Sequence, residues 1–60
     1  MQSFNKVVQA IQSGLSVTCY GNMVSLEGKY DWQEKKLRIN LSNGASYEAD
    51  GRDVQAMEIH

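Results

Sequence analysis

The sequence predicts a mainly β domain, in which an N-terminal helix is followed by a five-stranded, strongly bent antiparallel sheet that curls into a small barrel. Three observations lead to this class. Apolar residues recur at helical period before Gly14 and alternate with polar residues after it. Turn-forming pairs that contain glycine separate the alternating segments. Gly28 lies in the middle of the longest alternating segment, and we expect a sharp bend there.

The first element is a helix over about residues 4–13. Its apolar stripe consists of Phe4, Val7, Val8 and Ile11. Ser3 is expected at the N-cap and Gly14 just past the C-terminus. A helix of this length is unstable alone in water, so we expect the stripe to pack on the sheet. Its polar face is mostly uncharged, which argues against a membrane anchor.

Five strands are expected after the helix, over about residues 15–20, 23–31, 36–41, 45–49 and 55–59. Gly21-Asn22 is expected to form a two-residue turn that places Cys19 opposite Val24. The central register pairs Leu26 with Leu41, Gly28 with Ile39, Tyr30 with Leu37 and Asp31 with Lys36. This register gives every apolar residue an apolar or glycine partner, and a slip of one residue would expose the apolar set.

The third hairpin is expected to have the three-residue loop 42–44, with Gly44 in the left-handed conformation. This loop pairs Leu41 with Ala45 and Arg38 with Glu48. Residues 50–53 are expected to form a turn in front of the last strand, with Asp50 and Asp53 capping backbone groups. The five strands are expected to follow one another as an antiparallel meander, and residues 1–60 are thus expected to form a single domain.

Length and composition point to self-association. A 60-residue chain buries little surface, and the single cysteine excludes an internal disulfide. We therefore expect a homo-oligomer through the edges 45–49 and 55–59. The unpaired Cys19 fits a reducing, cytoplasmic location, and no segment is apolar enough to suggest a signal peptide or membrane span. A net charge of −1 gives no overall attraction to nucleic acid.

Catalytic chemistry is not expected. The sequence has no Ser/His/Asp combination, no phosphate-binding loop and no metal-ligand spacing, and its one histidine, His60, lies at the terminus. We therefore expect a protein that is not an enzyme, with no catalytic residue, no metal and no cofactor.

The order of the motifs V-x-x-x-G-N, L-x-G, L-x-I-x-L and D-G-x-x-V resembles the Sm/LSm/Hfq superfamily, whose fold is an SH3-like small barrel. The first family motif falls on Gly28, Tyr30, Glu34, Leu37, Arg38, Ile39 and Leu41. The second falls on Gly51, Val54 and Met57. The resemblance extends from Phe4 to Ile59, and Trp32-Gln33-Glu34 is similar to divergent cyanobacterial members of the Hfq branch.

The resemblance implies a ring in which the fourth strand of one subunit pairs with the fifth of the next. It also implies binding of single-stranded RNA, in post-transcriptional regulation. The RNA-binding residues carried over by position are Glu34, Lys35, Lys36, Arg38, Asp50, Gly51 and Arg52.

The chain departs from the family where RNA is bound. Lys36 stands at the position that stacks a base, Arg38 replaces an asparagine, and Asp50 replaces a basic residue. Any RNA binding is therefore expected to be weak and to use phosphates. The same cations are also explained as an ordinary solvated surface.

The alternative function is an oligomeric, Sm-like protein-binding module that has lost the RNA site. Tyr20 and Trp32 are its candidate anchors, because aromatic residues dominate binding hot spots. Trp32 is equally explained as a core residue that covers one end of the barrel.

Overall fold

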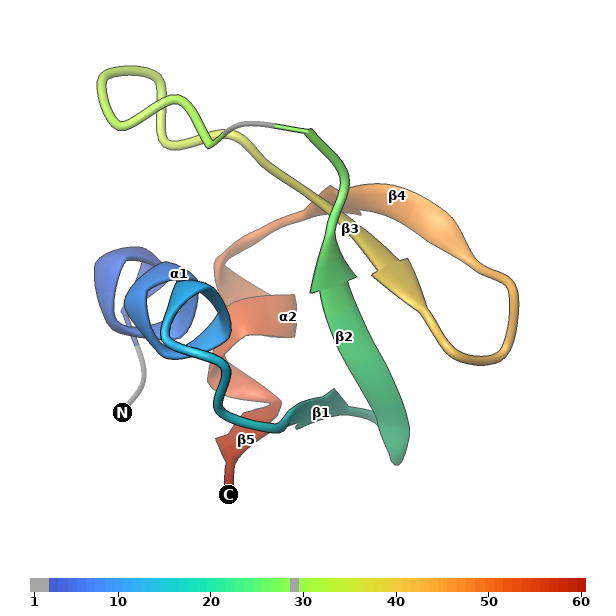
Figure 1. The fold of residues 1–60 in the computed structure, drawn as a ribbon. Coiled ribbons are helices and arrows are strands. Elements are labelled where there is room, and N and C mark those ends of the chain that lie inside the picture. The colour runs from blue at the N-terminus through green and yellow to red at the C-terminus, as the bar shows by residue number, and fades with distance from the viewer. Residues whose placement is uncertain (1–2, 29) are drawn as a thin grey trace.

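The computed structural model describes residues 3–28 and 30–60 and has a mainly β fold (Figure 1). Its elements are α1 (Phe4–Gln12), β1 (Val17–Cys19), β2 (Asn22–Leu26), β3 (Leu37–Leu41), β4 (Ser46–Ala49), α2 (Gly51–Gln55) and β5 (Met57–Ile59). The N-terminal helix and the five-stranded antiparallel sheet are confirmed.

The strand order in the sheet is β4-β3-β2-β1-β5, and the sheet is not closed. β5 does not continue the sheet beyond β4. It pairs with β1 at the opposite edge, with Val17 opposite Ile59. The chain can cross because α2, where we expected only a turn, connects β4 to β5 (Figure 1). β4 and β5 are therefore the two outer strands of the part of the sheet that the structure describes.

α1 has the expected caps. The hydroxyl of Ser3 accepts a hydrogen bond from the N–H of Lys6 at 3.2 Å. At the other end Gly14 has φ of +85°, and its N–H donates to the carbonyl of Ile11 while the N–H of Leu15 donates to Ala10. These two bonds form a Schellman motif, which ends the helix where glycine was expected to end it.

The first hairpin turns one position earlier than expected. Its turn is Tyr20-Gly21, with Cys19 opposite Asn22, so the expected pairing of Cys19 with Val24 is wrong. Both turn residues have positive φ, +52° and +81°, as a type I′ turn requires. Because the register differs by two residues, Cys19 still faces the core.

The second strand is shorter than expected, because β2 ends at Leu26. Leu26 lies opposite Ile39, which corrects the expected pairing of Leu26 with Leu41, whereas Asp31 does form a bridge with Lys36. The two-residue difference is absorbed between Leu26 and Asp31, where Gly28 has φ of +77°. Gly28 thus ends the strand instead of bending it. The part of this prediction that concerns Lys29 lies outside the described residues.

The third hairpin matches its predicted register, with Arg38 opposite Glu48 and Gly44 at φ of +95°. The core lies between α1, α2 and the inner face of the sheet. Its most completely buried side chains are Val7, Val8, Val17, Cys19, Leu37, Ile39 and Val54. Across the described ranges, neither helix has the length and apolar character needed to cross a membrane.

Candidate functional site

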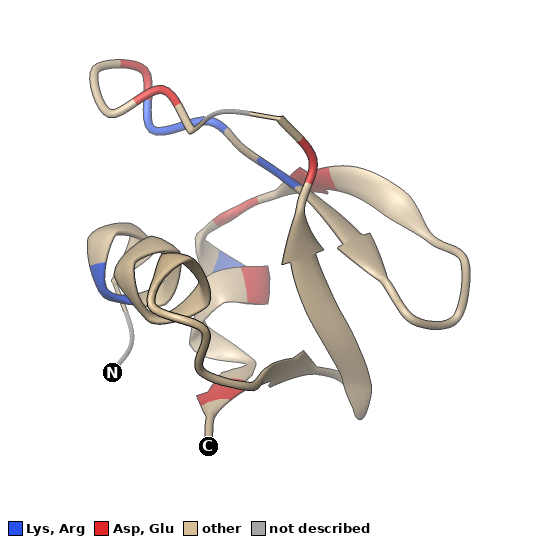
Figure 2. Cartoon of the chain, viewed as in Figure 1, with Lys and Arg blue, Asp and Glu red and all other residues tan. Residues whose placement is uncertain are grey.

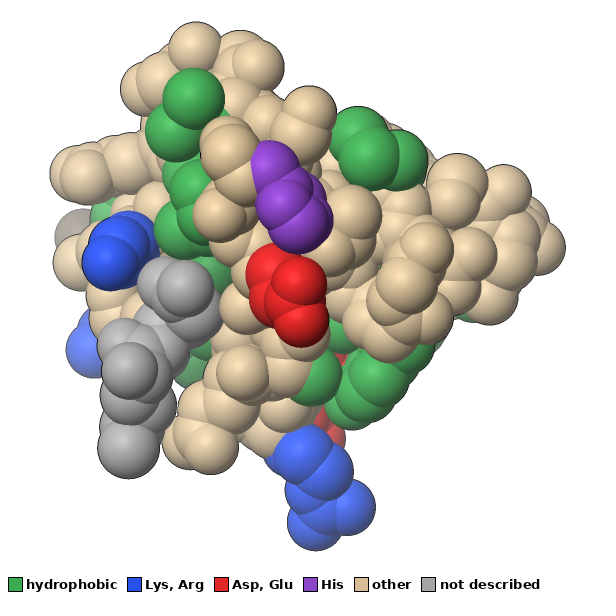
Figure 3. Space-filling model, turned by 90° about the horizontal axis from the view of Figure 1, so that it is seen from below, with side chains coloured by type: hydrophobic (Ala, Val, Ile, Leu, Met, Phe, Trp, Pro, Cys, Tyr) green, Lys and Arg blue, Asp and Glu red, His purple; other side chains and the backbone are tan. Residues whose placement is uncertain are grey.

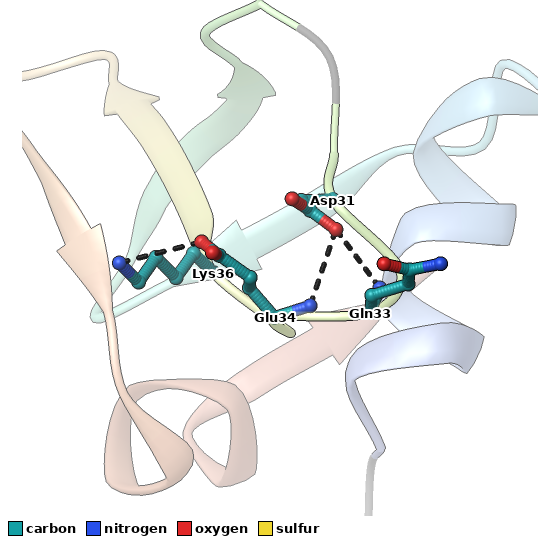
Figure 4. Close-up of polar contacts among 4 residues, drawn as sticks. All are labelled: Asp31, Gln33, Glu34 and Lys36. Atoms are coloured by element: carbon teal, nitrogen blue, oxygen red, sulfur yellow. Dashed lines mark hydrogen bonds and ion pairs between the residues drawn. The ribbon is translucent and has the colours of Figure 1, made fainter.

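The loop between β2 and β3 is organised by Asp31. Its carboxylate oxygen Oδ1 accepts hydrogen bonds from the backbone N–H of Gln33 at 2.9 Å and of Glu34 at 3.1 Å (Figure 4). Its carbonyl accepts from the N–H of Lys35 at 2.8 Å, and its backbone bridges to Lys36. The loop is therefore held by its own hydrogen bonds, which fix the positions of the side chains it carries.

Trp32 is the exposed aromatic residue of this loop. The residue is 46% exposed, whereas the neighbouring Tyr30 is only 8% exposed and belongs to the core. The two rings meet edge to face, with centroids 4.8 Å apart and planes at 70°. Asp31 and Gln33 line a shallow hollow together with these two rings. Trp32 is therefore a surface residue held against the core, which combines the two interpretations of this position.

Two of the four expected RNA-binding cations, Lys36 and Arg38, face carboxylates within the chain. Nζ of Lys36 lies 3.4 Å from a carboxylate oxygen of Glu34 (Figure 4). Nε of Arg38 lies 3.3 Å from Glu27, whose carboxylate also accepts from the hydroxyl of Ser46 at 2.9 Å. The hydrogen bond from Ser46, followed by the one from Arg38, lowers the pKa of Glu27. These pairs are exposed and individually weak, but they reduce the charge available to a phosphate.

Lys35 is different from its neighbours. It has φ of +54° and makes no ion pair within the described residues. Its side chain lines a second shallow hollow with Ser3, Phe4 and Asn5 at the start of α1.

The remaining carried-over residues lie at the start of α2, away from the Asp31–Lys36 loop in the same chain (Figure 2). Asp50 is the N-cap of this helix, and Asp53 completes a capping box by accepting from the N–H of Asp50 at 3.1 Å. The backbone N–H of Asp53 lowers the pKa of Asp50. Gly51 and Arg52 form the first turn. A single chain therefore does not gather the predicted RNA-binding residues into one patch.

Tyr20 is exposed but has a structural partner. The residue is 58% exposed, and its hydroxyl donates to Oδ1 of Asp53 at 2.9 Å. This hydrogen bond raises the pKa of Tyr20 to about 12. On the face of the molecule seen in Figure 3, the hydrophobic side chains form separate groups among polar atoms instead of one continuous patch. Trp32 is thus the better candidate anchor of the two.

Within residues 3–28 and 30–60, the acidic, cysteine and histidine side chains form no cluster that could hold a metal ion. Cys19 is buried, and burial raises the pKa of its thiol. A protonated, buried thiol is a poor nucleophile, so we treat Cys19 as a core residue.

Two structural residues of the site were not predicted from the sequence. Asp31 was assigned only to a strand end, although an aspartate that begins a polar loop often accepts hydrogen bonds from the next residues. Glu27 directly follows β2 and accepts hydrogen bonds from Arg38 in β3 and Ser46 in β4, and no local sequence pattern would identify it.

Comparison of the chain with protein-family models, with curated proteins and with solved structures finds no match.

Proposed function

We propose that this chain is a small protein-binding module whose binding site is the loop that carries Trp32. The observation that carries the proposal is the packing of an exposed indole on the buried ring of Tyr30. A large aromatic side chain that is already fixed in place loses little conformational entropy on binding, which is the property of a binding hot spot.

The surroundings of Trp32 favour a peptide or protein over RNA. The loop holds acidic as well as basic side chains, and the cations Lys36 and Arg38 already face carboxylates. Single-stranded RNA needs a positive groove beside its stacking residues, and the net charge of the chain is −1. A partner that offers an apolar pocket with polar groups around it suits this loop better.

Weak RNA binding is the second candidate, and one observation favours it. Lys35 and Trp32 lie in one loop, so a base could stack on the indole while the ammonium group of Lys35 contacts a phosphate. The ring assembly and the RNA binding implied by the Sm resemblance both stay predictions.

The two candidates can be separated with one reporter, because Trp32 is the only tryptophan. Peptides selected from a random library against the wild-type protein should shift its fluorescence, and Trp32→Phe should bind them more weakly. A-rich and U-rich oligonucleotides at low and high salt should leave the fluorescence unchanged. A selection that yields no peptide dependent on Trp32 would contradict the proposal, and salt-sensitive quenching by the oligonucleotides would favour the RNA-binding function.

A further inference from the structure

At the free edge of β4, the main-chain groups that point away from the sheet come from residues whose side chains face solvent. The N–H of Leu41 donates to the carbonyl of Ala45 at 2.8 Å. Because main-chain groups alternate in direction along a strand, those of Tyr47 also point toward β3. The groups that point away from the sheet are therefore those of Ser46 and Glu48, and both of these side chains are exposed.

The free edge of β5 has the opposite arrangement. The N–H of His60 donates to the carbonyl of Ser16 at 2.8 Å, so Glu58 also directs its main-chain groups toward β1. The groups that point away belong to Met57 and Ile59. Met57 is buried and Ile59 half-buried, because both side chains lie on the core face of the sheet.

This difference disfavours an antiparallel joint between β4 of one copy and β5 of the next, which is the joint of the ring that the Sm resemblance implies. Residues that exchange hydrogen bonds in an antiparallel pair place their side chains on the same face. Such a joint would therefore put the polar side chains of β4 on the face that carries Met57 and Ile59. A two-fold joint that pairs all three residues of β5 with a second β5 is disfavoured for another reason. Pairing Met57 with Ile59 of the other copy places Glu58 directly opposite Glu58, and like charges in that position are destabilising.

We propose that a second copy of this chain docks on β4, by a two-fold antiparallel pairing centred on Tyr47. In this register Ser46 of each copy exchanges main-chain hydrogen bonds with Glu48 of the other. Tyr47 lies opposite its counterpart on the core face, and each Ala45 lies opposite Ala49. The two sheets continue into each other with their core faces on the same side.

The side chains of β4 suit this occupant. No like charges lie directly opposite each other, since Glu48 meets a serine and already lies opposite Arg38 in its own copy. Tyr47 and Ala45 are only partly buried in the single chain, and the second copy would cover them. β4 and β5 lie at opposite ends of the sheet, so β5 stays free in this dimer (Figure 1).

Backbone N-methylation in a chemically synthesised chain tests the interface without changing a side chain. N-methyl-Glu48 removes a backbone N–H that points away from the sheet at β4. N-methyl-Ile59 removes the corresponding N–H at the free edge of β5 and is the matched control. Light scattering should give the mass of a dimer for the unmodified protein and for N-methyl-Ile59, and the mass of a single chain for N-methyl-Glu48. Circular dichroism should be alike for all three. A monomeric unmodified chain would overturn the proposal, as would loss of the dimer in the β5 variant.

Cross-linking gives a second, independent measurement. Cα atoms of a pair without mutual hydrogen bonds lie about 4.5 Å apart in an antiparallel ladder, which is within disulfide range. Tyr47→Cys should therefore form a disulfide-linked dimer on mild oxidation, whereas Glu58→Cys should not. The buried Cys19 is common to both variants. Cross-linking of Glu58→Cys alone, or of neither variant, would contradict pairing through β4.

Discussion

The hydroxyl of Tyr20 donates to Oδ1 of Asp53 at 2.9 Å, and this contact joins the β1–β2 turn to the first turn of α2. Oδ2 of the same carboxylate accepts a hydrogen bond from the backbone N–H of Asp50. The backbone carbonyl oxygen of Asp53 lies 3.6 Å from the thiol of Cys19. Asp53 therefore connects the turn that starts β2 with the helix that carries the chain to β5. Two segments far apart in the sequence are fixed to each other by one side chain.

This contact predicts how stability changes at alkaline pH. In the folded chain the pKa of Tyr20 is about 12, because its hydrogen bond to Asp53 favours the protonated phenol. The unfolded value is about 10. The stabilisation is thus complete below about pH 10 and is lost as the pH rises to about 12.

Tyr20→Phe should therefore lower Tm at neutral pH and weaken the fall of Tm in this alkaline window, as thermal melts would show. Burial also raises the pKa values of Tyr30 and Tyr47, so Tm of the variant should still fall somewhat with rising pH. If Tm of the variant falls with pH as steeply as that of the wild type, the hydrogen bond between Tyr20 and Asp53 does not contribute to stability.

Gly28 gives a prediction that separates backbone strain from packing. Its φ is +77°, and a Cβ at this position would meet no atom within 4 Å. Gly28→Ala and Gly28→Val should therefore both cost about 1–2 kcal/mol, because an L-residue is strained at positive φ. D-alanine at position 28 should not destabilise the chain. Urea denaturation would measure all three, and a much larger loss for valine than for alanine would indicate overpacking instead.

The sequence predicts the fold wherever side-chain alternation and turn chemistry agree. The helix caps at Ser3 and Gly14 and the register of the third hairpin all follow from local residues. The predicted register of the first hairpin was wrong because both Tyr20-Gly21 and Gly21-Asn22 suit a two-residue turn, and both turns keep Cys19 on the core face. Alternation cannot distinguish registers that differ by two residues.

The site was less predictable, because its features depend on contacts between distant residues. Trp32 and Lys35 were identified as exposed candidates, but the packing of Trp32 on Tyr30 and the neutralisation of Arg38 by Glu27 depend on the folded chain. The path of β5 to β1 was also missed. α2 is only five residues long and has one buried apolar side chain, too little for a periodic pattern.

The centre of the core predicts a graded loss of stability. Ile39 is fully buried and Leu37 nearly so, on the β3 strand between β2 and β4. Ile39→Val should cost about 0.5–1.5 kcal/mol and Leu37→Ala about 2–5 kcal/mol, because the larger truncation leaves a cavity. The core of a domain of this size rarely supplies more than about 3–5 kcal/mol of stability, so Leu37→Ala should be partly unfolded. Urea denaturation would measure these losses, with the exposed Ser25→Ala as control. Equal losses for the two core variants would contradict this packing.

The ring of Tyr30 packs edge to face against the indole of Trp32 and supports it. The hydroxyl of Tyr30 is buried and has no hydrogen-bond partner among the described residues, whereas its ring packs on the indole. Tyr30→Phe keeps the ring, so it should retain the affinity for selected peptides and be no less stable than the wild type. Tyr30→Leu keeps an apolar side chain but loses the aromatic contact, which is worth about 0.5–1.5 kcal/mol. It should therefore bind the peptides more weakly.

Fluorescence titration would measure the affinity, and thermal melts at the same protein concentration would show whether each variant is folded. If Tyr30→Leu is folded and binds as tightly as Tyr30→Phe, the indole does not need its aromatic support. A strong loss of binding in Tyr30→Phe would instead assign the hydroxyl itself to the binding site. The expected order, with phenylalanine equal to tyrosine and leucine weaker, follows only if Tyr30 acts by holding Trp32 in place.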